Sequence, residues 1–184
     1  VPDDNFEQAL IDLGYDDVLD NYVVTDSINS VTVLDVSNDS ISDLTGIEDF
    51  TALTNLNCRG NQLTSLDVSS NTALTELTCY ANALDSLDVS SNTALTELHC
   101  SNNQLTSLDV SSNTALTQLH CSSNQLTYLN MKNGLTDQLS SFSAQNNSLT
   151  CIETLDPVYA TANWTYANEN IDDGVTFADI CYAS

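Results

Sequence analysis

A repeat of 21 residues constrains the fold of this chain more than any other feature of its sequence. The segment from Leu95 to Ala115, LTELHCSNNQLTSLDVSSNTA, has near copies that begin at Leu53, Leu74 and Leu116. A fixed period of this length is typical of stacked-repeat proteins, in which each unit buries its apolar face only against its neighbours. The sequence therefore predicts a repeat solenoid.

The repeats divide the chain into three parts. We expect an N-terminal cap over residues 1–30, the repeats over residues 31–153 and a C-terminal cap over residues 154–184. The repeats start at residues 31, 53, 74, 95, 116 and 139, and the last of them is partial. Caps are needed because the ends of a solenoid would otherwise expose apolar surface.

Each repeat consists of two similar halves. In the pattern LxxLxC side chains alternate between the two faces of a strand, so Leu98 and Cys100 point inward and the residues beside them point outward. The second half, LTSLDVSSN, follows the same pattern. An inward Asn in five of the copies is expected to hydrogen-bond the backbone of neighbouring coils. We predict a mainly β solenoid with two extended segments per turn and no long helix.

The N-terminal cap is expected to contain a short helix. An apolar stripe at helical spacing begins at Phe6 and ends at Gly14, and Asp4 with Glu7 fits a capping box, which predicts a helix over about residues 4–13. Three acidic residues follow in a loop: Asp16, Asp17 and Asp20. Calcium prefers carboxylate oxygens, but the spacing is not that of an EF-hand, so we favour a solvated loop over a calcium site.

The composition excludes several partners. The net charge is −24, with Arg59 and Lys132 as the only basic residues apart from two histidines. Such a surface repels nucleic acid and anionic lipid, so we expect no nucleic-acid partner. No segment approaches the roughly 18 apolar residues that a membrane helix needs, so we expect no membrane insertion. The chain begins at Val1 without Met, as a mature secreted protein or a trimmed chain would.

Four of the six cysteines share one repeat position: Cys58, Cys79, Cys100 and Cys121. Four thiolates could hold zinc, but a straight ladder with steps of about 4.8 Å cannot converge on one tetrahedral centre. Val36 and Ala144 take the equivalent position in other copies. We therefore expect buried free thiols that act as small apolar residues.

The other two cysteines, Cys151 and Cys181, bracket the C-terminal cap. In an exported protein we predict that they form a disulfide. The bond would close a loop of about 30 residues and stabilise the fold by roughly 3–4 kcal/mol in the chain-entropy estimate.

The pattern LxxLxCxxNxLxxLDVxxNxx resembles the leucine-rich repeat family, and more narrowly its bacterial 21-residue class with nested half repeats. Leu44–Phe50 (LTGIEDF) resembles the longer internalin-like repeat. The opening VPDDNFEQALIDLGYDD and the ending CIE…YATANWT…C resemble caps of secreted leucine-rich repeat proteins from Bacteroidetes-type bacteria. The resemblance implies a right-handed parallel solenoid, a secreted or outer cell-surface location, and recognition of a protein or a glycan.

Outward positions of the first strand vary between copies, whereas the core positions do not. Solenoids bind partners on such a face. We predict a partner-binding surface made of Asn55, Arg59, Glu76, Tyr80, Glu97, His99, Gln118 and His120. One alternative is neutral drift of surface residues. Another is a metal site formed by the two histidines with Glu97, but we favour two neutral imidazoles over such a site. On protonation near pH 6.5, Glu97 is expected to favour charged histidines.

The second strand carries a row of acidic side chains: Asp67, Asp88 and Asp109, followed by Asn130. Stacked carboxylates repel, so we expect them to raise one another's pKa. Neighbouring hydroxyl groups and water, or bridging divalent cations, would relieve the repulsion, and we favour the hydroxyl groups.

No catalytic constellation is evident. The sequence has no nucleophile–base–orienter set and no glycine-rich phosphate loop, so we expect neither an enzyme nor, calcium aside, a cofactor.

We predict a monomeric recognition module, secreted or at the cell surface, that binds a protein through the first-strand face, as in adhesion. A glycan-binding module associated with polysaccharide capture and a passive spacer are the alternatives. Glycan binding usually needs exposed aromatic platforms, and Tyr80 is the only aromatic residue on this face.

Overall fold

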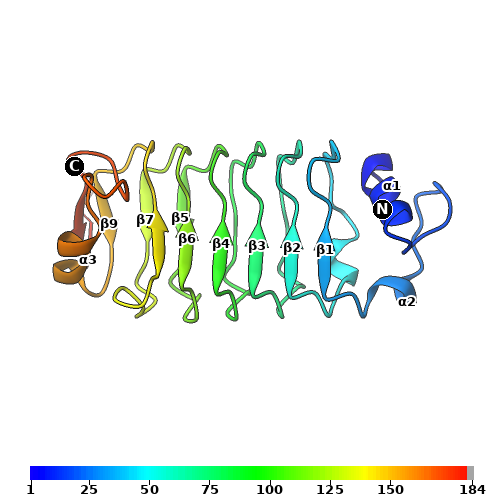
Figure 1. Ribbon diagram of the computed structural model, residues 1–184, viewed down its shortest axis with the longest axis horizontal. Helices are drawn as coiled ribbons and strands as arrows, with labels where there is room; N and C mark the ends of the chain where they lie inside the picture. Colours follow the sequence, from blue (N-terminus) through cyan, green and yellow to red (C-terminus); the bar gives the residue numbers. More distant parts are fainter. Residues whose placement is uncertain (182–184) are drawn as a thin grey trace.

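One coil of chain per repeat stacks on the next along the long axis of the molecule (Figure 1). The computed structural model describes residues 1–181. Each coil contributes one short parallel strand to a six-stranded sheet with the order β1-β2-β3-β4-β6-β8. These strands are β1 (Val33–Asp35), β2 (Asn55–Asn57), β3 (Glu76–Thr78), β4 (Glu97–His99), β6 (Gln118–His120) and β8 (Ser141–Ser143). The predicted repeat solenoid is confirmed.

The second extended segments form a smaller parallel sheet with the order β10-β9-β7-β5. Its strands are β5 (Ser107–Asp109), β7 (Tyr128–Asn130), β9 (Cys151–Glu153) and β10 (Thr176–Ala178). Residues 65–67 and 86–88 keep the same exposed–buried–exposed alternation but are not regular strands. The two-segment coil is therefore confirmed, although only the C-terminal coils pair their second segments as a sheet.

The core is a column of apolar side chains between the six-stranded sheet and the opposite row of second extended segments. The central residue of every strand in the first sheet is buried: Leu34, Leu56, Leu77, Leu98, Leu119 and Phe142. Each such burial stabilises the fold by roughly 1.5–3 kcal/mol. The ladder cysteines are fully buried free thiols, as predicted. Burial raises the pKa of Cys79 and Cys121 to about 12, so these thiols stay protonated at neutral pH.

Buried asparagines bind one coil to the next, as predicted. The Nδ2 group of Asn103 donates to the carbonyl oxygens of Cys79 and Cys100, both at 3.1 Å. Its Oδ1 atom accepts from the backbone N–H of Leu84 at 3.0 Å. The equivalent residues Asn61, Asn82, Asn124 and Asn147 also bind the backbone of the preceding coil. Buried backbone groups at the turn thus find partners in the adjacent repeat.

The N-terminal cap consists of α1 (Asp4–Asp12) and α2 (Thr25–Ile28), and a 3₁₀ turn, η1 (Ile47–Asp49), follows in the first repeat. The helix is present, but the prediction that Asp4 caps it was wrong. Asp3 is the capping residue, and its Oδ1 accepts from the backbone N–H groups of Asn5 and Phe6. Glu7 is buried and accepts from the N–H groups of Asp20 and Tyr22, so it completes no capping box.

The C-terminal cap contains two elements that the sequence analysis missed, α3 (Pro157–Asn163) and β10, which pairs with β9. Asp156 caps the helix, with Pro157 in its first turn. Trp164 fills the cap, with ring-centroid distances of 4.7 Å to Phe142 and 5.7 Å to Phe177. The predicted disulfide between Cys151 and Cys181 is present.

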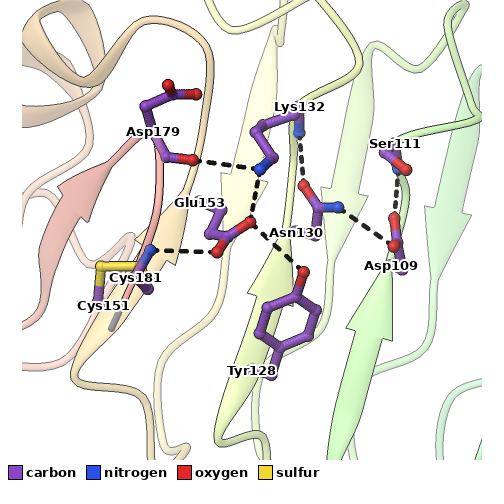
Figure 2. Close-up of polar contacts among 9 residues, drawn as sticks. All are labelled: Asp109, Ser111, Tyr128, Asn130, Lys132, Cys151, Glu153, Asp179 and Cys181. Atoms are coloured by element: carbon purple, nitrogen blue, oxygen red, sulfur yellow. Dashed lines mark hydrogen bonds and ion pairs between the residues drawn. A yellow bond between two sulfur atoms is a disulfide. The ribbon is translucent and has the colours of Figure 1, made fainter. Parts of the chain in front are cut away.

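A polar network centred on Glu153 also attaches the cap to the coils (Figure 2). Glu153 is 7% exposed, and its Oε2 lies 2.8 Å from Nζ of Lys132. Its Oε1 accepts from the backbone N–H of Cys181 at 3.1 Å, and Lys132 Nζ donates to the carbonyl oxygen of Asp179. A buried carboxylate needs such partners, so this network holds residues 179–181 against β9. No helix within the described residues is long and apolar enough to cross a membrane.

Candidate functional site

The register of the first sheet brings the predicted binding residues together on one face. The pairings place Asn55 beside Glu76, Glu76 beside Glu97, and Glu97 beside Gln118. A second row of outward side chains, two residues further along the strands, places His99 beside His120. Arg59 and Tyr80 follow β2 and β3 by two residues. All eight therefore line a continuous surface across β2, β3, β4 and β6, here called the first-strand strip.

Arg59 and Tyr80 form one ordered pair on the strip. The Nη1 group of Arg59 donates to the phenolic oxygen of Tyr80 at 2.8 Å, and its guanidinium carbon lies 5.7 Å from the ring centroid. The contact combines a hydrogen bond with a cation–π interaction. Arg59 forms no ion pair with any carboxylate within residues 1–181, whereas Lys132 is paired with Glu153. The strip thus presents an oriented positive group on a strongly negative chain.

The two histidines stack face to face. Their ring centroids are 4.6 Å apart and their planes differ by 12°. The Nε2 atom of His120 lies 2.8 Å from Oγ of Ser141. Burial, followed by the neighbouring imidazole of His99, lowers the pKa of His120. The expectation that Glu97 would favour a charged histidine is wrong for His120, because the net shift of its pKa is downward.

Polar side chains on neighbouring strands also pair with one another. Gln118 Nε2 donates to Oε1 of Glu97 at 2.6 Å, so this carboxylate faces an amide. Asn57 Nδ2 donates to Oδ2 of Asp35 on β1 at 3.0 Å. Within one segment, Asn55 Oδ1 also accepts from the hydroxyl of the adjacent Thr54. These contacts restrict rotamers before any partner arrives, and so reduce the entropy lost on binding.

Sequence reasoning missed the extension of the strip onto β8. Ser141 pairs with Gln118, and Ser143 pairs with His120. The hydroxyls of Ser122 and Ser143 also form a short hydrogen bond. The register of the sixth copy, LSSFSAQNN, gave the signal for this extension, because Ser141 and Ser143 take its outward positions.

The acidic row lies on the opposite row of segments, and serine donors relieve the repulsion between its carboxylates, which is the alternative that we favoured. The pKa of Asp67 and of Asp88 is lowered by hydrogen bonds from Ser69 and Ser90, whose backbone N–H groups both donate at 2.9 Å. Burial acts to raise the pKa of Asp109, but hydrogen bonds from Ser111 and Asn130 outweigh it, and the net shift is downward.

Asp67 acts to raise the pKa of Asp88, as expected, but the net shift of Asp67, Asp88 and Asp109 is downward. The local donors outweigh the repulsion between neighbouring carboxylates, which remain ionised at neutral pH. Serine and aspartate side chains from three coils also line a broad hollow of about 810 Å³ on this side.

The acidic loop of the N-terminal cap holds Asp16, Asp17 and Asp20. Asp16 is half-buried and the other two are exposed. Across residues 1–181, no group of three or more His, Cys, Asp or Glu side chains is arranged to hold a metal ion. The solvated loop stays our prediction, with calcium binding as the alternative.

Comparisons with known proteins agree with this architecture. A family model described as the leucine-rich repeat domain of the endo-beta-N-acetylglucosaminidase EndoS matches residues 26–124. Internalin J of Listeria monocytogenes serotype 4b (strain F2365) is 42% identical over 70 residues, which are 38% of this chain and 8% of internalin J.

Two solved structures are similar over most of this chain. The functional domain of InlJ from Listeria monocytogenes, which includes a cysteine ladder, has a TM-score of 0.56 and 28% identity over 83% of this chain and 50% of that one. An internalin, inlF, from Listeria monocytogenes str. 4b F2365 has a TM-score of 0.68 and 21% identity over 96% of this chain and 55% of that one. The chain thus spans about half of each solved relative. Because the family match covers more than half of its residues, this chain belongs to the leucine-rich repeat family, in its bacterial, internalin-like branch.

Proposed function

We propose that this chain is a non-catalytic recognition module that binds a protein partner through the first-strand strip. The observation that carries the proposal is the contrast between a constant core and a varied, pre-ordered outer face. Side chains of different chemistry lie side by side on four adjacent strands, and several are held by contacts across strands. A surface of this kind favours binding because few rotamers need to be ordered.

The chemistry of the strip indicates the contacts that a partner would make. Arg59 is positioned by Tyr80, so its remaining N–H groups are free to bind a carboxylate in the paired geometry that guanidinium groups favour. Tyrosine and arginine are also the side chains that most often dominate interface energy. The stacked rings of His99 and His120 add a flat surface beside this pair.

We place the module outside the cell, secreted or at the surface, and expect it to act as a monomer in adhesion. The disulfide supports this location because such bonds persist in oxidising compartments. Internalin J, a relative by sequence, comes from a bacterium. The opposite row is less suited to binding a protein, because its hollow is lined by small serines and aspartates rather than by anchoring aromatic or arginine side chains.

The test has two stages. The full chain is first screened against a library of surface proteins and an array of polysaccharides, with and without calcium. The affinity for the partner found is then measured for two matched double variants. Tyr80→Ala with His99→Ala alters the strip, and Ser86→Ala with Asp88→Asn alters the opposite row.

We expect the strip variant to bind at least about tenfold more weakly and the opposite-row variant to bind as the parent does. Outward changes should alter the free energy of unfolding by less than about 1 kcal/mol, which a urea titration of each variant verifies. Loss of binding only in the opposite-row variant would reject the proposed face. Binding to polysaccharides alone would indicate the glycan-capture alternative, and a screen without any partner would leave the passive spacer.

A further inference from the structure

The C-terminal cap contains a hollow of about 480 Å³ that is remote in sequence from the first-strand strip. Of its eleven lining residues, five are aromatic or aliphatic, three are threonines, two are aspartates and one is a glycine. Its main lining residues are Trp164, Tyr166, Ile171, Asp173, Val175 and Phe177. Ligand sites in proteins commonly have this volume and this combination of apolar walls with few polar groups.

The fold holds the walls of this hollow in place. Trp164 packs against Phe142 of β8 and Phe177 of β10, and is 5% exposed. Asp172 accepts hydrogen bonds from the backbone N–H groups of Asn146 and Asn147, at 2.8 and 2.9 Å. The segment after residue 170 is thereby attached to the last coil, so the hollow is formed without a ligand.

Two lining groups remain free to contact a ligand. Tyr166 is 61% exposed, and Asp173 is also exposed. Neither side chain forms a hydrogen bond within residues 1–181. Asp172, by contrast, already has both carboxylate oxygens engaged by backbone N–H groups.

The charge of the hollow selects the class of ligand. The lining contains two carboxylates and no basic side chain, on a chain with a net charge of −24. An anionic ligand is repelled, whereas a cation is attracted both by the carboxylates and by aromatic rings. A lysine or arginine side chain has an apolar stem that would pack on Tyr166 and Val175, and a charged head that would reach Asp173.

A sugar ring fits less well. Its binding would gain nothing from the negative charge, and the indole of Trp164, being almost fully covered, offers no broad stacking face. We propose that this hollow is a second recognition site, which takes a lysine or arginine side chain from the surface of a protein partner. This proposal does not depend on the first-strand strip, so an experiment can reject one binding site without rejecting the other.

The single tryptophan of the chain lines the hollow, so its fluorescence reports on ligand entry. The full chain is titrated with Nα-acetyl-lysine amide and Nα-acetyl-arginine amide. Nα-acetyl-norleucine amide, which has a similar stem without the charge, is the control ligand, and N-acetylglucosamine tests the sugar alternative. The variants are Asp173→Asn, Tyr166→Ala and Tyr166→Phe, with Tyr22→Ala as a control at the opposite end of the molecule.

We expect saturable fluorescence changes with both cationic amides, and salt should weaken their binding. Norleucine amide should bind at least about tenfold more weakly than either cationic amide. Asp173→Asn and Tyr166→Ala should each weaken the binding of cationic amides about tenfold, whereas Tyr166→Phe and Tyr22→Ala should leave it unchanged. Equal binding of norleucine amide, saturation by the sugar alone, or no saturation by any probe would each overturn the proposal. Circular dichroism confirms that each variant is folded.

Discussion

Replacing Asn103 with alanine should remove hydrogen bonds that join its own coil to the preceding one. This side chain is 8% exposed and lies at the turn after β4. Its Nδ2 group donates to the carbonyl oxygens of Cys79 and Cys100, and its Oδ1 atom accepts from the backbone N–H of Leu84. Alanine can form none of these hydrogen bonds.

The contacts of each partner set the magnitude of the effect. The carbonyl oxygen of Cys79 also accepts from Asn82, and that of Cys100 also accepts from Asn124, so both keep one partner. The N–H of Leu84 keeps none among the described residues, and an orphaned buried donor costs about 1–3 kcal/mol. Adding the loss of two ordinary hydrogen bonds at about 0.5–1.5 kcal/mol each, we expect Asn103→Ala to destabilise the fold by roughly 2–6 kcal/mol.

Urea unfolding followed by circular dichroism measures this change. Gln104→Ala is the matched control, because Gln104 is the exposed neighbour and its side chain forms no hydrogen bond within the described residues. Asn103→Asp separates the two roles of the amide, since the carboxylate still accepts from Leu84 but cannot donate. We expect it to be destabilising as well. If Asn103→Ala lowers the free energy of unfolding no more than Gln104→Ala does, the asparagine ladder is not what binds the coils.

Three further predictions concern the whole chain. Thiol titration of the denatured, unreduced protein should find four free thiols, and a count of six would show that Cys151 and Cys181 are not bonded. The pKa values of Asp67, Asp88 and Glu153 are lower in the fold than their ordinary values of 3.8, 3.8 and 4.5. The stabilisation from these groups is complete above the ordinary values and is lost as pH falls through the folded ones, so the melting temperature should fall steeply below about pH 4. Glu153→Gln should reduce that slope, and an unchanged slope would exclude this residue as a source. At a net charge of −24, NaCl should raise the melting temperature by screening self-repulsion, and a decrease with salt would contradict this account.

The sequence predicts the coils well because their pattern repeats. Alternation assigned Leu98 and Cys100 to the core and His99 to the surface, and the constant period fixed the register that brings His99 beside His120. The same period made the buried asparagines recognisable as a ladder. Repetition thus converts a local pattern into a three-dimensional prediction.

The caps and the contacts between side chains were less predictable because they depend on single, non-repeating interactions. Asp3 caps α1 rather than Asp4, and its second oxygen is fixed by Ser42, which is distant in sequence. The helix α3 could have been inferred from Asp156 followed by Pro157, a known helix start. The direction in which Arg59 extends toward Tyr80 depends on rotamers, which a one-dimensional pattern does not contain.

Hydroxyl-radical footprinting with the identified partner tests the central claim most directly. Oxidation of Tyr80, His99 and His120 is compared in the free and bound chain, with Tyr128 on the opposite row as the internal reference. The account predicts strong protection of the three strip residues and no change at Tyr128, which is 38% exposed in the free chain. Protection of Tyr128 without protection of Tyr80, His99 and His120 would show that the partner binds the other face.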